Sequence, residues 1–199
     1  ITNITALDYP KVIGFDSGPG NCLMDCWSRL HKKGNYDENG LWASSGTINK
    51  SLLETMMGDE YFSRKHPKST GPDYFNYEWI NKNLSTLSKK ISPEDVQATL
   101  LQVTILSLIE AIEVLKLTNE NIYLCGGGVH NEFLCNKLNE QSKAKIGTTS
   151  DLGINPDYVE AICFAWLAKQ RLENKKFNLS KITGSKGEVY LGRIYEPAK

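Results

Sequence analysis

Apolar and β-branched residues dominate two short stretches at the start of the chain, Ile1–Thr5 and Lys11–Phe15. Such runs predict strands, and the turn residues Asp8-Tyr9-Pro10 between them favour an antiparallel pair. Farther along, apolar residues recur every three to four positions, which predicts helices over 21–30, 48–57, 78–87 and 92–117. The last of these has the clearest start, because a capping serine, a proline and two acids stand together in residues 92–95. Residues 32–45 and 58–77 are expected to be irregular.

The second half of the chain alternates strand and helix patterns. Strands are expected at 121–125 and 145–149, helices at 131–140 and 157–173, and a final strand-like run at 189–194. The helix at 157–173 has one apolar face, formed by Val159, Ile162, Cys163, Trp166 and Leu167. Strand–helix alternation is typical of a parallel sheet with helices on its faces. We therefore predict a single α/β domain over residues 1–199, with a mixed sheet and helices on both faces.

Composition narrows the class of protein. Hydrophobic residues make up 40% of the 199 positions and charged residues 23%, as in ordinary globular domains. The 23 Lys and Arg balance the 23 Asp and Glu, so no basic excess indicates a nucleic-acid or membrane partner. We recognise no signal segment and no apolar run of membrane-spanning length, and the five cysteines suit a reducing compartment. These features together predict a cytoplasmic protein.

Two glycine-rich turns follow predicted strands, DSGPGN at residues 16–21 and CGGGVHN at 125–131. Ligands of open α/β sheets collect at the carboxyl ends of strands, and the N–H groups of a following helix favour phosphate. Asp16 can be interpreted as a general base in phosphoryl transfer or as a turn-forming residue. Gly18 and Gly20 would let the backbone approach nucleotide phosphates, and Ser17 adds a hydroxyl donor.

The second glycine-rich turn, CGGGVHN, predicts a particular ligand less specifically than the first. A dinucleotide-binding fingerprint needs glycine at position 131, where Asn131 stands. Asp151, just past the next predicted strand, could take the place of the acidic ribose ligand, so a Rossmann-type NAD-dependent enzyme stays a rival. A tight turn without any ligand is the simplest alternative for Gly126–Gly128.

Six motifs occur in one order along the chain: VIGFDSGPGN, HPKSTGPDYFN, DVQATL, CGGGVHN, VEAICFAWLA and KITGS. Together they closely resemble the anhydro-N-acetylmuramic acid kinase family, part of the sugar kinase, Hsp70 and actin superfamily of two-lobed phosphotransferases. The resemblance extends over essentially all 199 residues and implies an RNase H-like (actin-like ATPase) lobe. It corresponds to the C-terminal half of such a kinase, so we expect the N-terminal lobe, with its own phosphate loop, to be absent from this sequence.

The resemblance implies that the protein uses ATP and Mg²⁺ to phosphorylate 1,6-anhydro-N-acetylmuramic acid during recycling of the bacterial cell wall. Water opens the anhydro bridge while the freed 6-oxygen accepts the γ-phosphoryl group. Asp16 would activate this water, and Asp16 and Glu160 would contact the sugar; a first-turn helix acid is the alternative for Glu160. Gly126, Gly127 and Gly128 would bind adenosine. Asn131 would touch the nucleotide or cap the following helix.

Some positions depart from the family pattern or have no assigned role. Ser17 stands where threonine is expected, and Pro72-Asp73 where Arg-Glu is expected, which puts any role of an arginine there in doubt. Lys68, Ser69 and Thr70 match a family loop of unassigned role. The three histidines are predicted to be structural or surface residues (His31, His66, His130). The long apolar helix at 95–117 could serve a homodimer contact, and a non-catalytic nucleotide-binding or interaction module is the remaining rival.

Overall fold

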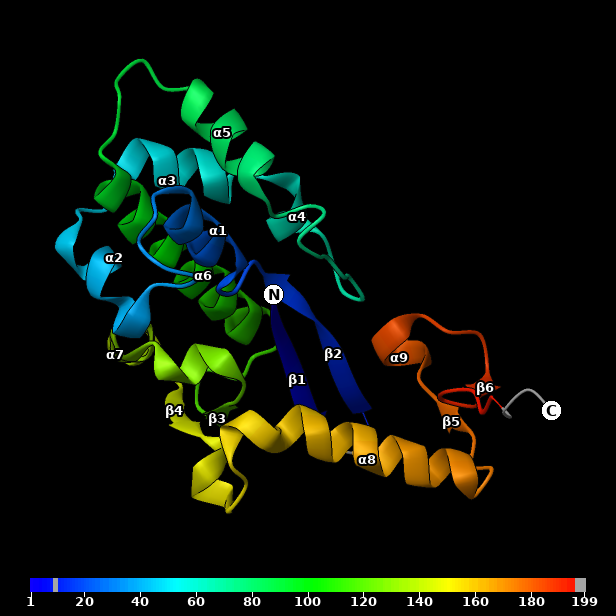
Figure 1. Cartoon of the computed structure of the whole chain (residues 1–199). Helices are drawn as coiled ribbons and strands as arrows, with labels where there is room; N and C mark the ends of the chain where they lie inside the picture. The colour runs from blue at the N-terminus through cyan, green and yellow to red at the C-terminus, as the bar shows by residue number, and fades with distance from the viewer. Residues whose placement is uncertain (9–10, 196–199) are drawn as a thin grey trace.

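The computed structural model describes residues 1–8 and 11–195, so the predicted turn at Tyr9-Pro10 lies outside the described residues (Figure 1). The strands are β1 (Thr2–Asp8), β2 (Lys11–Gly18), β3 (Asn121–Leu124), β4 (Lys145–Thr148), β5 (Phe177–Asn178) and β6 (Glu188–Val189). The α-helices are α1 (Cys22–Leu30), α2 (Leu41–Ser45), α3 (Lys50–Met57), α4 (Glu60–Ser63), α5 (Tyr77–Ser85), α6 (Pro93–Val114), α7 (Glu132–Gln141), α8 (Val159–Leu172) and α9 (Ser180–Thr183). Short 3₁₀ helices are η1 (Glu38–Gly40), η2 (Gly127–His130), η3 (Thr149–Leu152) and η4 (Pro156–Tyr158).

Helix α6 forms the centre of the core. Helices α1, α2, α3 and α7 and the β1–β2 hairpin all pack against it. It begins as the sequence predicts, with the Ser92 hydroxyl accepting a hydrogen bond from the Asp95 N–H at 3.3 Å. Contrary to the sequence-based expectation, α6 is long and apolar enough to cross a membrane, but 78% of its apolar window is buried inside the protein. Its apolar surface is therefore core, and not the dimer contact considered above.

The strands form three separate two-stranded sheets among the described residues, instead of the single mixed sheet predicted. The β1–β2 pair is antiparallel and the β3–β4 pair is parallel, as predicted. The β1–β2 hairpin packs on α6, and β4 packs on α7. Each pair of strands is therefore covered by a helix, and within the described ranges no hydrogen bonds join the two pairs into one sheet. The predicted strand at 189–194 is wrong beyond Val189, because β6 ends there.

Two segments predicted to be irregular contain helical turns. The stretch 32–45 holds η1 and α2, because the Asp37 carboxylate accepts hydrogen bonds from the N–H groups of Trp42 and Ala43 at 2.8 and 2.9 Å. The stretch 58–77 holds α4, which begins where the Asp59 carboxylate accepts the Tyr61 N–H at 2.9 Å. In both cases a single aspartate supplies the acceptor that the free N–H groups of a short helix need.

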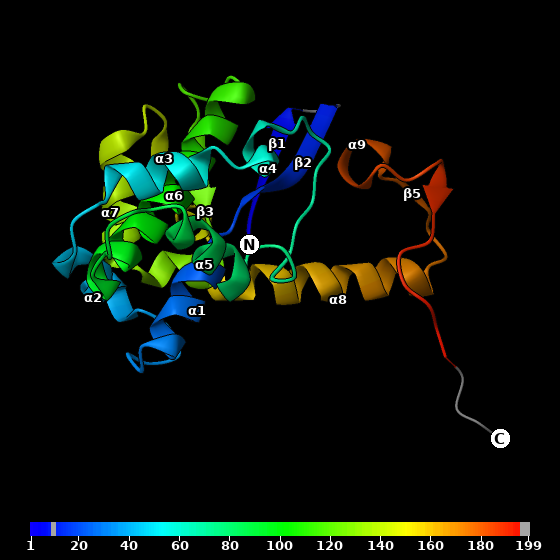
Figure 2. The same cartoon turned by 90° about the horizontal axis from the view of Figure 1, so that it is seen from above.

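Helix α8 is exposed along nearly its whole length and extends away from the other helices (Figures 1 and 2). On its predicted apolar face, Ile162 is 53% and Trp166 48% exposed, and Gln170 is its one buried residue. This face therefore does not cover a sheet within the described residues. Beyond α8, the chain returns through β5 to α9, which lies against β2 on the side of the hairpin away from the helical body (Figures 1 and 2).

Candidate functional site

Asp16 stands near the end of β2, opposite Asn3 of β1, and four groups hold it in place. One carboxylate oxygen accepts a hydrogen bond from the Asn3 side-chain amide, and the other accepts the Thr70 N–H at 2.8 Å. Its backbone N–H donates to the Lys68 carbonyl at 3.1 Å, and its carbonyl accepts the Tyr61 hydroxyl at 2.8 Å. The carboxylate is therefore oriented from both sides while the residue stays half-buried.

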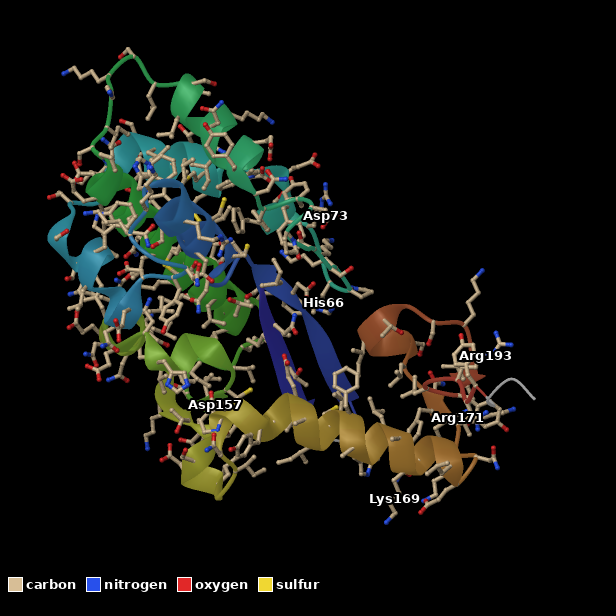
Figure 3. The ribbon with its side chains drawn as sticks, viewed as in Figure 1. His66, Asp73, Asp157, Lys169, Arg171 and Arg193 are labelled. Atoms are coloured by element: carbon tan, nitrogen blue, oxygen red, sulfur yellow. The ribbon has the colours of Figure 1, made fainter. Side chains whose placement is uncertain are left out.

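The loop that contributes Thr70 is itself anchored, which gives Lys68 a structural role that the sequence left open. The Lys68 ammonium donates to the carbonyls of Tyr61 and Phe62 at 3.0 and 3.1 Å, at the end of α4. Burial lowers the pKa of Lys68 below its ordinary value. Burial and, next, the charge of Asp16 raise the pKa of Tyr61 to about 12, so its hydroxyl stays protonated and donates to Asp16 at neutral pH. Asp73 lies exposed beyond this loop (Figure 3).

Asp16 lines a cleft of about 590 Å³. The floor comes from both strands of the hairpin, one wall is the loop Pro67–Ser69, and the other wall is Ile182–Gly184 at the end of α9. The KITGS motif thus contacts the strand that carries Asp16, although no role is predicted for its residues from the sequence. Only the folded chain shows this, because the two segments are far apart in sequence and neither carries a pattern that pairs them.

Ser17 points into the protein, as expected for the neighbour of an outward-facing strand residue. It is 2% exposed, and its hydroxyl donates to the Thr2 carbonyl at 3.3 Å. The hydroxyl predicted to contact the nucleotide therefore joins the two strands of the hairpin instead.

The glycines of the first turn are explained by packing within the chain. A Cβ on Gly18 would lie 2.8 Å from Cβ of Ser107 on α6, so glycine lets the strand approach the core helix. Gly20 has a φ of +57°, and a Cβ there would lie 2.8 Å from the carbonyl carbon of Ile1. Both glycines allow a close approach of groups of this chain, and the approach of nucleotide phosphates to their backbone stays a prediction.

In the described part of the chain, the space beside Gly126 and Gly127 of the second turn is empty, whereas groups of the chain fill the space beside the glycines of the first turn. Apart from the neighbouring residues of the turn, no atom of the described residues lies within 4 Å of a Cβ built on Gly126 or Gly127. Gly126 needs glycine for its φ of +78°, but Gly127 has no such requirement. The Gly126 N–H donates to the Pro156 carbonyl at 3.0 Å, which fixes the turn beside η4. The space above Gly127 is thus available to a ligand that packs against the backbone.

The structure brings the two glycine-rich turns together. A Cβ on Gly128 would lie 3.8 Å from the side-chain nitrogen of Asn21, the last residue of the first turn. Asn21 stands at the start of α1, yet its side chain makes no capping hydrogen bond there. On the other side of the second turn, His130 Nε2 lies 2.7 Å from an Asp157 carboxylate oxygen (Figure 3). One continuous region therefore joins the starts of α1, α7 and α8.

Asn131 caps α7. It is 7% exposed, and its side-chain oxygen accepts the Leu134 N–H at 2.9 Å. A Cβ on Gly40 would collide with this side chain, so it is enclosed by η1 as well. Of the two roles considered for Asn131, the structure supports the cap, and a contact with the nucleotide stays a prediction.

Glu160 lies in the exposed first turn of α8, beside the second glycine turn. Desolvation and, next, the charge of Glu160 raise the pKa of the Cys125 thiol, which directly precedes Gly126. Glu160 is not among the described residues that line the Asp16 cleft. The two carboxylates predicted to contact the sugar therefore stand at separate places within the described part of the chain.

The histidines are predicted to be structural or surface residues, and two of them pack on aromatic rings. Residues 1–8 and 11–195 contain no cluster of three His, Cys, Asp or Glu side chains that could hold a metal ion. His31 packs on the ring of Trp27, with centroids 4.2 Å apart. His66 stacks on Phe15 at 5.3 Å, beside the cleft (Figure 3).

The family model for anhydro-N-acetylmuramic acid kinase matches residues 1–197. The chain belongs to this kinase family. It is 43% identical over 199 residues to the anhydro-N-acetylmuramic acid kinase of Coxiella burnetii (strain Dugway 5J108-111), covering 98% of the chain and 53% of that protein. The kinase of the same name from Pseudomonas fluorescens (strain Pf0-1) is 42% identical over 196 residues, covering 98% of the chain and 54% of that protein. The one from Pseudomonas syringae pv. syringae (strain B728a) is 40% identical over 198 residues, with the same coverage.

The family assignment confirms the resemblance inferred from the six motifs and overturns the Rossmann-type alternative. The chain spans about half the length of the curated anhydro-N-acetylmuramic acid kinases that it matches.

Proposed function

We propose that this chain is one lobe of an ATP-dependent kinase that converts 1,6-anhydro-N-acetylmuramic acid to N-acetylmuramic acid 6-phosphate in cell-wall recycling. The observation that carries the proposal is the Asp16 carboxylate, held on an open cleft by hydrogen bonds from Asn3 and Thr70. The match to the kinase family over residues 1–197 supports this interpretation of the cleft.

Asp16 acts in this proposal as the general base. Each carboxylate oxygen accepts one hydrogen bond within the chain and keeps a second lone pair for a water proton. The proton of the water passes to Asp16, the water oxygen bonds to C1 of the sugar, and the bond between C1 and O6 breaks. O6 takes the γ-phosphoryl group of ATP, and ADP leaves. The fixed backbone of Asp16 keeps the carboxylate in position throughout.

The open backbone at Gly126 and Gly127 is the place where this chain would hold adenosine, because a flat nucleoside can pack there without displacing a side chain. Mg²⁺ keeps several waters and is held by substrate phosphates with one or two carboxylates, so it does not require the cluster of protein ligands that residues 1–8 and 11–195 lack. Asp16 is the carboxylate of the cleft that could contact a water of the ion. When bound, Mg²⁺ neutralises charge on the phosphoryl group being transferred.

The remaining features of the proposal concern the whole protein. We infer an RNase H-like lobe of a two-lobed cytoplasmic kinase, in which further protein covers α8. The exposed Ile162 and Trp166, four residues apart on one face of α8, support this, because apolar surface exposed on one face indicates an interaction site. The match to only about half of each relative is consistent with a second lobe of similar size.

The test uses a kinase of the relatives' full length that contains this chain, incubated with ATP, the anhydro sugar and ¹⁸O-labelled water. Mass spectrometry should show a phosphorylated sugar that carries one ¹⁸O, formed only with ATP. The 199-residue chain alone should form none, since phosphoryl transfer needs groups on both sides of the nucleotide. ADP binding without any product from the full-length protein would favour the non-catalytic module instead.

A further inference from the structure

Helix α9 packs against β2, and its Ile182 comes close to Gly14. A Cβ built on Gly14 would lie 3.3 Å from Cγ2 of Ile182 and 3.5 Å from the Thr5 hydroxyl oxygen. Glycine weakens the interior of a strand and often marks a site where another group approaches closely. Gly14 does not adopt a positive φ, so its backbone would accept another residue, and the approach of Ile182 is what favours glycine here.

The two walls of the Asp16 cleft differ in how they are held. The loop Pro67–Ser69 is joined to β2 by the hydrogen bond between the Asp16 N–H and the Lys68 carbonyl, and to α4 through the Lys68 ammonium. Helix α9 closes its own backbone hydrogen bonds, from Ile182 and Thr183 to Leu179, and rests on β2 through side-chain contact. The packing of Ile182 on Gly14 is therefore one of the contacts that hold α9 beside the cleft.

The lining of the cleft has the mixed character that a saccharide requires. Ile182 supplies apolar surface for the C–H face of a sugar ring, while Asn3, Thr5 and Ser69 supply polar side chains for its oxygen and amide substituents. Gly184, at the rim, has a φ of +72° and no atom within 4 Å of a Cβ built on it, so its backbone is open to the cleft.

We propose that Ile182, Thr183 and Gly184 form the wall that selects the acceptor sugar, at a distance from Asp16 that Gly14 fixes. This inference rests on the proposed function for the identity of the sugar. It assigns a specificity role to the KITGS segment and to a strand glycine two residues before the base.

The test is a double-mutant cycle in a full-length kinase that contains this chain. Gly14→Ala should displace Ile182 by a few tenths of an ångström and weaken binding of the anhydro sugar about tenfold, with ADP affinity and the melting temperature unchanged. Ile182→Ala should also weaken sugar binding. When Gly14→Ala is added to the Ile182→Ala variant, it should weaken sugar binding less than twofold further. The Ile182 methyl group that the new alanine would displace is absent from that variant.

Calorimetry with the anhydro sugar and with ADP gives both affinities without requiring turnover. Ile48→Ala is the matched control, since Ile48 is 41% exposed, close to the 36% of Ile182, and does not line the cleft. Sugar affinity unchanged by Gly14→Ala and by Ile182→Ala, or no sugar binding by the parent kinase, would overturn the inference. If the parent binds the sugar but forms no product, the proposed function fails while the cycle still decides the role of α9.

Discussion

Replacing Asp16 by asparagine tests the chemistry most directly, because the structure predicts a small effect on folding and a large one on turnover. The asparagine oxygen can accept the Thr70 N–H, and its new NH₂ group faces Asn3. The Asn3 amide can turn to offer its own oxygen, which restores the second hydrogen bond. Shape and both partners are thus kept, and what is lost is the ability to accept a proton.

The two effects differ enough to be separated. Loss of one hydrogen bond would cost about 0.5–1.5 kcal/mol of stability, and each kcal/mol lowers the melting temperature of a chain this long by about 2–4 °C. A general base contributes about 10²- to 10⁴-fold to the rate, or about 2.7–5.4 kcal/mol of transition-state stabilisation. Asp16→Asn should therefore lower kcat at least about 100-fold while the fold remains intact.

The assay compares kcat, ADP affinity and melting temperature for the full-length parent, Asp16→Asn and Glu54→Gln. Glu54 is an exposed carboxylate on α3 and controls for the loss of one negative charge. ADP affinity should hold or rise in Asp16→Asn, since a charge near the phosphates has gone. A well-folded Asp16→Asn enzyme with near-parental kcat would refute the assignment of the base and make Glu160 the next carboxylate to test.

Alanine at two glycines should distinguish packing from ligand binding: Gly18→Ala pushes on Ser107 and should cost about 1–3 kcal/mol of stability, seen in thermal melts. Gly127→Ala has open space around it and should leave the melt within about 0.5 kcal/mol of the parent while weakening ADP binding in calorimetry. Asn131→Ala removes the cap of α7 and should lower stability by about 0.5–2 kcal/mol, again by thermal melts, with ADP affinity unchanged. Burial raises the pKa of Asp59, but hydrogen bonds from the Tyr61 N–H and two aromatic side chains outweigh it and hold the pKa below the ordinary 3.8. Its stabilisation is therefore present above pH 3.8 and lost as the pH falls through the folded value, so Asp59→Asn should lose less stability than the parent between about pH 7 and about pH 3.

Local signals in the sequence were enough to locate much of the fold. The start of α6 follows from Ser92 and its neighbours, and the β-branched and apolar runs at 1–5 and 11–15 predict the hairpin that carries Asp16. Helix α2 could not be found in this way, because its carboxylate cap, Asp37, stands outside the helix and is itself held by Gln97 of α6 at 3.1 Å. Such a helix depends on a partner far along the chain, and no local pattern records it.

In the candidate site, too, some features follow from local sequence and others depend on residues far along the chain. The sequence singles out Asp16 and both glycine turns, but the turns have different reasons for their glycines. Gly18 faces Ser107 across a distance that forbids a side chain, whereas Gly127 faces open space. The residue type is identical, and the difference lies in what fills the volume beside it. Asp16 and Thr183 line the same cleft, and this likewise depends on how the chain returns to the hairpin through β5 after α8.

Several elements that pack against helix α6 precede it in the sequence, so they leave the ribosome before it does. The hairpin, α1, α2 and α3 are all synthesised before Ser92, yet they bury their apolar residues on the helix that follows it. Leu23 and Leu52, which no solvent reaches in the finished fold, stay uncovered during that interval. Nascent chains with exposed apolar surface are the ones that chaperones bind. The yield of this protein in cells should therefore depend on chaperones that hold the segment before Ser92, and on how quickly the ribosome completes α6.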